Sequence, residues 1–220
     1  MTLGDATESF AGDSYFEGFT PWRALLSSGK DYGFKKDEDL FSNVVRLGDD
    51  PETAETEKSG LVYMPVYSKL VDYKTQTSRG KVRVGFKIKP SIIGDSGFHV
   101  GVVPEYNVDV CQAFKLADNN GIPVILTDNG QIELDASSWY DADMVLDVIN
   151  KMATITLKEH SSSTEIADFS LEFPTLTSVA GIVFNAVGGT SVYMDDVKIR
   201  RRNELYTEAD KSNGKHYEGW

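Results

Sequence analysis

The segment from Gly80 to Lys89 alternates apolar and polar residues with a period of two, and no other feature of the chain restricts the fold as strongly. One face of an extended chain would carry the apolar residues Val82, Val84, Phe86 and Ile88. The other face would carry four cations: Lys81, Arg83, Lys87 and Lys89. Because successive side chains of a strand point to opposite sides, the pattern predicts a half-buried β-strand with one core face and one basic face.

Short apolar runs between turn residues recur along the chain, and no stretch shows helical periodicity of useful length. Ten tyrosines and eleven phenylalanines accompany these runs, and aromatic residues favour strands. We expect strands over 42–47, 60–67, 80–89, 98–103, 110–116, 123–127, 131–134, 144–149, 152–157, 165–171, 179–184 and 191–200. Asn150 and Lys151 are expected to join two of them as a tight hairpin. About a dozen short strands at this spacing predict an all-β protein, an antiparallel β-sandwich of the jelly-roll or concanavalin-like type.

The 220 residues are expected to form one domain. The hydrophobic fraction of 40% and the charged fraction of 25% are those of a globular protein with an apolar core. The periodic pattern ends at Arg202, so we place the domain at residues 1–202 and expect 203–220 to be a polar tail or linker. The acidic stretch over 49–59 is expected to be a solvated loop.

The formal net charge of −12 argues against a nucleic-acid partner, because affinity for phosphates comes largely from Lys and Arg. No run approaches the ~20 apolar residues of a membrane helix, so no membrane partner is expected. Cys111 is the only cysteine, which excludes an intrachain disulfide and a thiolate metal cluster. Met1 opens a polar segment without a signal-peptide core, so the protein is either intracellular or a module of a secreted parent.

The sequence lacks the common catalytic motifs. His99, His160 and His216 form no metal-binding pair, and no nucleophile elbow, Walker loop or dinucleotide turn is present. The nearest approach to a catalytic pair is Glu133 and Asp135, which would face the same side of a strand ~7 Å apart. Sandwich glycosidases of similar appearance carry a third acid three residues further on, where this chain has serine. We therefore expect a solvated strand end here and no enzymatic activity.

Two segments near the ends of the domain are Tyr15-Phe16-Glu17-Gly18-Phe19 and Ser191-Val192-Tyr193-Met194-Asp195-Asp196-Val197-Lys198-Ile199. They resemble the first and last strands of β-sandwich carbohydrate-binding modules, and residues 80–90 and 147–157 are similar to the middle strands. The resemblance covers 10–201. Such modules are appended to secreted polysaccharide lyases and glycoside hydrolases and hold the parent enzyme on its polymer. The resemblance implies an extracellular, non-catalytic module that binds a plant or microbial polysaccharide during plant cell wall degradation.

The same resemblance implies a structural calcium ion bound by Glu17 near the first strand and Asp195 in the last. Strict alternation would place Asp195 on one face with Tyr193, Val197 and Ile199, turning its carboxylate inward at the rim of the core. A buried carboxylate needs hydrogen bonds or a cation, and calcium takes six to eight oxygen ligands. The alternative is a carboxylate that accepts backbone N–H groups or faces water. Asp196 would face outward and is a second choice.

Exposed aromatic residues are candidate sugar contacts, because the flat C–H faces of sugar rings pack against aromatic planes. Tyr63 and Tyr67 would lie on one face of a strand, ~13 Å apart, and Tyr73 follows in the next loop. Trp22, in the loop after Pro21, is expected to be either a platform or a plug. Trp139 is expected to cap the core.

If the strand over 60–67 pairs near the strand over 80–89, these tyrosines would adjoin Lys81, Arg83, Lys87 and Lys89. An aromatic and basic strip would favour an anionic uronic-acid polymer through charge-assisted hydrogen bonds. Alternatively, the cations solvate an exposed sheet face or protect an edge strand. Two rival functions stay open: a sandwich-fold polysaccharide lyase or glycoside hydrolase with a catalytic cluster on the concave sheet, and a cell-surface adhesion domain whose tyrosines form a protein interface.

Overall fold

The computed structural model describes residues 5–8, 22–26, 32–40, 42–48, 59–63, 80–94, 97–103, 111–176, 179, 181–186 and 189–202. Most of them lie in fifteen β-strands. The strands are β1 (Asp5–Glu8), β2 (Trp22–Leu26), β3 (Tyr32–Asp37), β4 (Ser42–Gly48), β5 (Ser59–Tyr63), β6 (Lys81–Ile92), β7 (Phe98–Val103), β8 (Cys111–Asn119), β9 (Ile122–Thr127), β10 (Gly130–Glu133), β11 (Tyr140–Asp147), β12 (Met152–Glu159), β13 (Glu165–Glu172), β14 (Gly181–Ala186) and β15 (Ser191–Arg202). Within these ranges there is no helix of the length and apolarity needed to cross a membrane.

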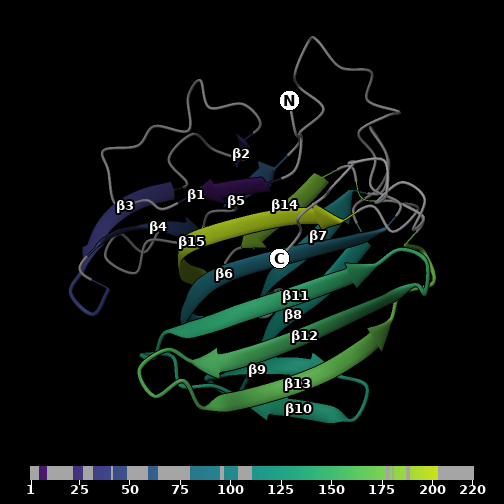
Figure 1. Ribbon diagram of the computed structural model, residues 1–220. Helices are drawn as coiled ribbons and strands as arrows, with labels where there is room; N and C mark the ends of the chain where they lie inside the picture. Colours follow the sequence, from purple (N-terminus) through teal and green to yellow (C-terminus); the bar gives the residue numbers. More distant parts are fainter. Residues whose placement is uncertain are drawn as a thin grey trace.

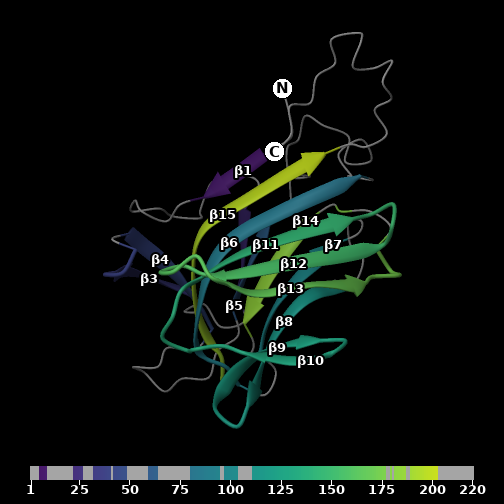
Figure 2. The same cartoon turned by 60° about the horizontal axis from the view of Figure 1, so that its bottom comes forward.

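The strands form two antiparallel sheets packed face to face. The eight-stranded sheet has the order β13-β12-β11-β6-β15-β4-β3, with β1 paired to β15, and the seven-stranded sheet has the order β10-β9-β8-β7-β14-β5-β2. In Figure 1, β15, β6, β11, β12 and β13 lie in front of the seven-stranded sheet, and Figure 2 shows the same two layers after rotation. The predicted all-β sandwich is confirmed.

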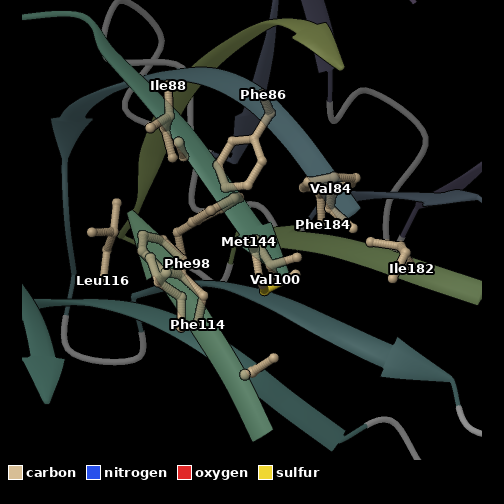
Figure 3. Close-up of a cluster of buried hydrophobic side chains, with 14 of the residues drawn as sticks. Val84, Phe86, Ile88, Phe98, Val100, Phe114, Leu116, Met144, Ile182 and Phe184 are labelled. Atoms are coloured by element: carbon tan, nitrogen blue, oxygen red, sulfur yellow. The ribbon is translucent and has the colours of Figure 1, made fainter. Parts of the chain in front are cut away.

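The core lies between the sheets and is built from the inward-facing half of each strand. On β6, residues Val82, Val84, Phe86 and Ile88 are buried, as their alternation predicts. The ring of Phe86 packs edge-on against Phe184 of β14, with centroids 5.4 Å apart, and against Phe114 of β8, 6.1 Å apart. Figure 3 shows these rings meeting between the sheets. Burial of apolar side chains, at about 25 cal/mol per Å², is the main force that holds the layers together.

Strands β11 and β12 form the predicted hairpin, but its connection is longer than the expected Asn150-Lys151. Asp147 and Met152 are the last paired residues, so the connection contains four residues, 148–151. Asp147 Oδ1 accepts hydrogen bonds from the backbone N–H groups of Ile149 and Asn150. Burial by itself would raise the pKa of Asp147, but the bonds from Asn150 and the charge of Lys81 outweigh it and lower that pKa. The ionised carboxylate therefore stabilises the turn.

Most predicted strands are present with shifted ends. The strand expected over 144–149 begins at Tyr140, whereas β7 has the expected bounds. Strands β1, β2 and β3 were not predicted. Trp22 begins β2 and does not lie in a loop, so that expectation was wrong. Residues 15–19, 49–58, 64–67 and 203–220, which carry other expectations, lie outside the described residues.

The pairing on which the aromatic and basic strip depends, between the strand over 60–67 and the strand over 80–89, does not occur. Strand β5 lies in the seven-stranded sheet between β14 and β2, whereas β6 lies in the eight-stranded sheet between β11 and β15. Tyr63 is paired in register with Ile182 on one side and Trp22 on the other. The two strands lie in different sheets because the apolar face of β6 must pack against a second sheet, and β5 is part of that second sheet.

A β-bulge in β15 changes which residues share a face. Asp195 pairs with Lys87 and Lys198 pairs with Gly85, so Asp196 and Val197 together oppose the single residue between them on β6. Asp196 adopts a left-handed conformation with φ of 55°. An extra residue shifts the alternation by one. Val197 therefore faces the core, whereas Asp195 lies on the face of its register partner Lys87. The expectation that Asp195 and Val197 share a face was wrong.

A candidate binding site on the outer face of the eight-stranded sheet

A depression of about 330 Å³ lies on the outer face of the eight-stranded sheet, where β6 is flanked by β11 and β15. Its floor is formed by Gly85, Phe86 and Ala142. Six charged side chains surround the floor: Arg83, Lys87, Asp141, Asp143, Asp196 and Lys198. We refer to this feature as the Gly85 depression.

Two local features of the sequence create the depression. Gly85 occupies an outward position in the alternation of β6, so a side chain is missing from the middle of a row of long basic residues. Its conformation does not require glycine, and a Cβ there would meet only the Ala142 carbonyl oxygen and Lys198 Cβ, both at 3.9 Å. Beside it, the bulge in β15 turns Asp196 toward the same face. Bulges and left-handed non-glycine residues are common next to functional sites.

One wall is the ion pair between Arg83 of β6 and Asp143 of β11. The two residues lie in neighbouring rows of paired strands, and Arg83 Nε donates to Asp143 Oδ1 at 2.6 Å while Nη2 donates to Oδ2. The hydrogen bond to Asp143 raises the pKa of Arg83. A two-point contact of this kind fixes the orientation of both planar groups.

The opposite wall is a three-residue ion cluster. Asp196 Oδ2 accepts hydrogen bonds from Lys198 Nζ at 2.9 Å and from Lys87 Nζ at 3.1 Å. Burial by itself would raise the pKa of Asp196, but the two lysines outweigh it and lower that pKa. Asp196 is therefore an anion that holds two flexible lysine side chains at the edge of the depression.

Asp141 completes the site at the β11 side. Its Oδ2 lies 2.8 Å from Nδ1 of His160, whose backbone N–H donates to the carbonyl oxygen of Trp139. This imidazole fixes the position of Asp141 from outside the depression. The arrangement places cationic hydrogen-bond donors and carboxylate acceptors around a floor of strand backbone, which suits a ligand with several hydroxyl groups.

The sequence predicted the cations of this face but not their partners. Arg83 and Lys87 line the depression, as described above. Lys81 Nζ lies 3.5 Å from Asp147 Oδ2. Lys89 Nζ lies 3.7 Å from Asp39 Oδ2 and 6.0 Å from the ring centre of Trp139. The expected basic strip is therefore a row of ion pairs.

The aromatic candidates do not join these cations. Trp22 and Tyr63 lie at facing register positions on β2 and β5 of the other sheet. Tyr67 and Tyr73 lie outside the described residues. Trp139 is buried, with 4% of its surface exposed, as expected for a residue that caps the core.

Only one of the two residues of the calcium hypothesis lies in the described part of the chain: Asp195 is described and Glu17 is not. Asp195 is 4% exposed, and its Oδ1 accepts the backbone N–H of Asp196 at 2.7 Å. No group of three or more His, Cys, Asp or Glu residues suited to a metal occurs in the same described ranges. The calcium hypothesis therefore stays a prediction that depends on Glu17.

Glu133 and Asp135 lie at the end of β10 and in the turn that follows it. Glu133 is exposed at the end of β10, and Asp135 Oδ1 accepts the backbone N–H and the hydroxyl of Ser137. These bonds, with a weaker one from Ser138, lower the pKa of Asp135. Asp135 is the cap of a surface turn, which agrees with the solvated strand end that we expected.

The two sheets and their order define a β-sandwich of the legume-lectin, or concanavalin-like, type. The lectin UEA-II in complex with galactose aligns with a TM-score of 0.55 at 10% identity, over 89% of this chain and 97% of the lectin. The Lotus tetragonolobus seed lectin aligns with a TM-score of 0.53 at 10% identity, over 90% and 98% of the two chains. Domain 4 of AbnA, a GH43 extracellular arabinanase from Geobacillus stearothermophilus, in complex with arabinotriose, aligns with a TM-score of 0.50 at 13% identity, over 89% and 91%. No family model and no curated protein sequence matches the chain.

Proposed function

We propose that this protein is a non-catalytic carbohydrate-binding module that holds a glycan in the Gly85 depression. The observation that carries the proposal is the depression itself: an open floor over Gly85, surrounded by fixed carboxylates and cations on the outer face of a lectin-type sheet. Sugar hydroxyls both donate and accept hydrogen bonds, and bonds to charged groups contribute more than bonds between neutral groups.

The fold neighbours support this choice of ligand class. The lectin UEA-II is in complex with galactose, and the arabinanase domain is in complex with arabinotriose. We further propose that the ligand in nature is a plant or microbial polysaccharide and that the module is extracellular, as part of a larger secreted enzyme.

An enzymatic role has one observation in its favour, the position of Asp141 and Asp143 two residues apart on β11. A glycosidase needs one carboxyl group that donates a proton and a second that acts as base or nucleophile. Asp143 instead accepts hydrogen bonds from Nε and Nη2 of Arg83, and Asp141 is bonded to His160. We therefore expect that the protein releases no reducing ends from any polysaccharide that it binds.

Affinity-gel electrophoresis against soluble polysaccharides tests the proposal. The variant Gly85→Leu should lose retardation by at least about tenfold, because the leucine side chain occupies the floor without backbone strain. The matched control is Ser170→Leu, which adds the same side chain to the exposed part of β13 on the same sheet, away from the depression. Equal retardation of the wild type and Gly85→Leu would move the site elsewhere, and no retardation of the wild type on any gel would favour the adhesion alternative.

A further inference from the structure

The Gly85 depression has a balanced set of charges, and this balance limits what it can bind. We infer that it selects a neutral glycan, bound as a single sugar unit, and discriminates against uronic acids. The inference rests on the proposed function and specifies the ligand class of the same site.

The cations and the carboxylates of the Gly85 depression are equal in number. Among the described residues that line the depression, three are cations (Arg83, Lys87 and Lys198) and three are carboxylates (Asp141, Asp143 and Asp196). Each cation is bonded to a carboxylate of the same set. A sugar carboxylate would therefore have to compete with protein carboxylates for every cation, and it would lie close to three like charges.

Asp141 and Asp196 provide the carboxylate oxygens that a ligand can use as hydrogen-bond acceptors. Both lysine bonds to Asp196 end on Oδ2, and the His160 bond to Asp141 also ends on Oδ2. No described residue donates to Oδ1 of either carboxylate, although an ionised carboxylate can accept about four hydrogen bonds. Two charged acceptors suit the O–H donors of a neutral sugar, whereas a uronate carboxylate has no proton to donate to them.

The volume of the depression and the net charge of the whole protein also favour a neutral ligand. A volume of about 330 Å³ lies near the lower end of ligand pockets, about 300 to 1,000 Å³, which favours one sugar unit over a long buried chain. The net charge of −12 also opposes the approach of a polyanion, although salt weakens this effect.

The experiment compares neutral polymers with acidic ones. Affinity gels would contain galactan, arabinan, arabinoxylan or mixed-linkage glucan on the neutral side and polygalacturonate or alginate on the acidic side, at 0.15 M salt, roughly physiological ionic strength. We expect retardation of the wild type by at least one neutral polymer, its loss in Gly85→Leu, and no retardation by acidic polymers that depends on Gly85.

A charge-changed variant tests the cause. In the double variant Asp143→Asn with Asp196→Asn, retention by the neutral polymer should fall by about tenfold or more, and salt-sensitive retention by polygalacturonate should increase. The control is Asp128→Asn with Asp168→Asn, which makes the same change in net charge at two exposed residues outside the depression. Unchanged retention by both polymers in the first variant would overturn the inference.

The outcomes separate the inference from the proposed function. Acidic polymers that retard the wild type and lose this effect in Gly85→Leu would leave the glycan site in place and overturn the neutral ligand. Acidic retention that Gly85→Leu leaves intact, without any neutral retention, would overturn both the inference and the proposed site, because the polymer would then bind outside the depression. Absence of retention on every gel would overturn the proposed function itself. The wild-type comparison decides these cases even if the double variant does not fold.

Discussion

Replacement of Phe86 by alanine tests the packing that supports both the core and the floor of the depression. Phe86 is 4% exposed, and its ring contacts Phe184 and Phe114 edge-on at centroid distances of 5.4 and 6.1 Å. A buried Phe→Ala change costs about 3 to 5 kcal/mol through lost transfer energy and the cavity that it leaves. The two ring contacts place Phe86→Ala near the upper end of that range, since an aromatic pair adds about 0.5 to 1.5 kcal/mol.

The assay is urea unfolding followed by circular dichroism, with the free energy of unfolding extrapolated to water. Stability of a single domain is typically about 5 to 15 kcal/mol, so the loss would be visible as a large shift of the midpoint. Ile166→Ala is the control, because that side chain is 36% exposed and its loss should change stability by less than about 0.5 kcal/mol. A loss below about 2 kcal/mol for Phe86→Ala would refute the position of this ring between the sheets.

Two further predictions concern carboxylates. Asp147→Ala should lower stability by about 1 to 2 kcal/mol, because the turn after β11 loses its acceptor for two backbone N–H groups. Folding lowers the pKa of Asp147, so the stability that its carboxylate contributes is fully present above about pH 4. That stability is lost as the pH falls through the pKa of the folded state. The urea midpoints of the wild type and the variant should therefore converge on acidification and stay apart at pH 7. If Glu17 and Asp195 bind calcium, EGTA should lower the melting temperature of the wild type but not of Asp195→Asn; equal melting curves with calcium and with EGTA would exclude a structural calcium ion.

The strands were predictable because their signal is local. Val82, Val84, Phe86 and Ile88 repeat at every second position, and burial of one face of β6 requires that pattern. Strand β11 shows the same alternation, with Asp141 and Asp143 alternating with the buried residues Tyr140, Ala142 and Met144. Had the pairing of β11 with β6 been known, these acids would have been expected beside the cations of β6.

The pairing of strands was not predictable, because it depends on contacts between segments far apart in the chain. Strand β5 precedes β6 in sequence yet belongs to the other sheet, and nothing within 60–67 specifies its partner. This is why Tyr63 and the basic face of β6 were wrongly placed together. The ionic partners of Lys81, Arg83 and Lys87 come from β11 and β15, more than fifty residues further along the chain.

The bulge in β15 also escaped prediction. A left-handed residue in a bulge is most often glycine, and the sequence has Asp196 at that position. Strict alternation therefore assigned Asp195 and Val197 to one face. Two adjacent acids within an apolar strand were the available signal, since aspartate tolerates the left-handed conformation better than most residues.

An NMR titration tests the central claim most directly. Labelled protein would be titrated with an oligosaccharide of the neutral polymer that retards it on gels, and the backbone amide shifts would be mapped onto the two sheets. The account predicts that the largest shifts occur at Gly85, Ala142 and Asp196, around the depression. Shifts confined to the seven-stranded sheet, for example at Val62 and Ile182, would contradict it and place the sugar on the opposite side of the sandwich.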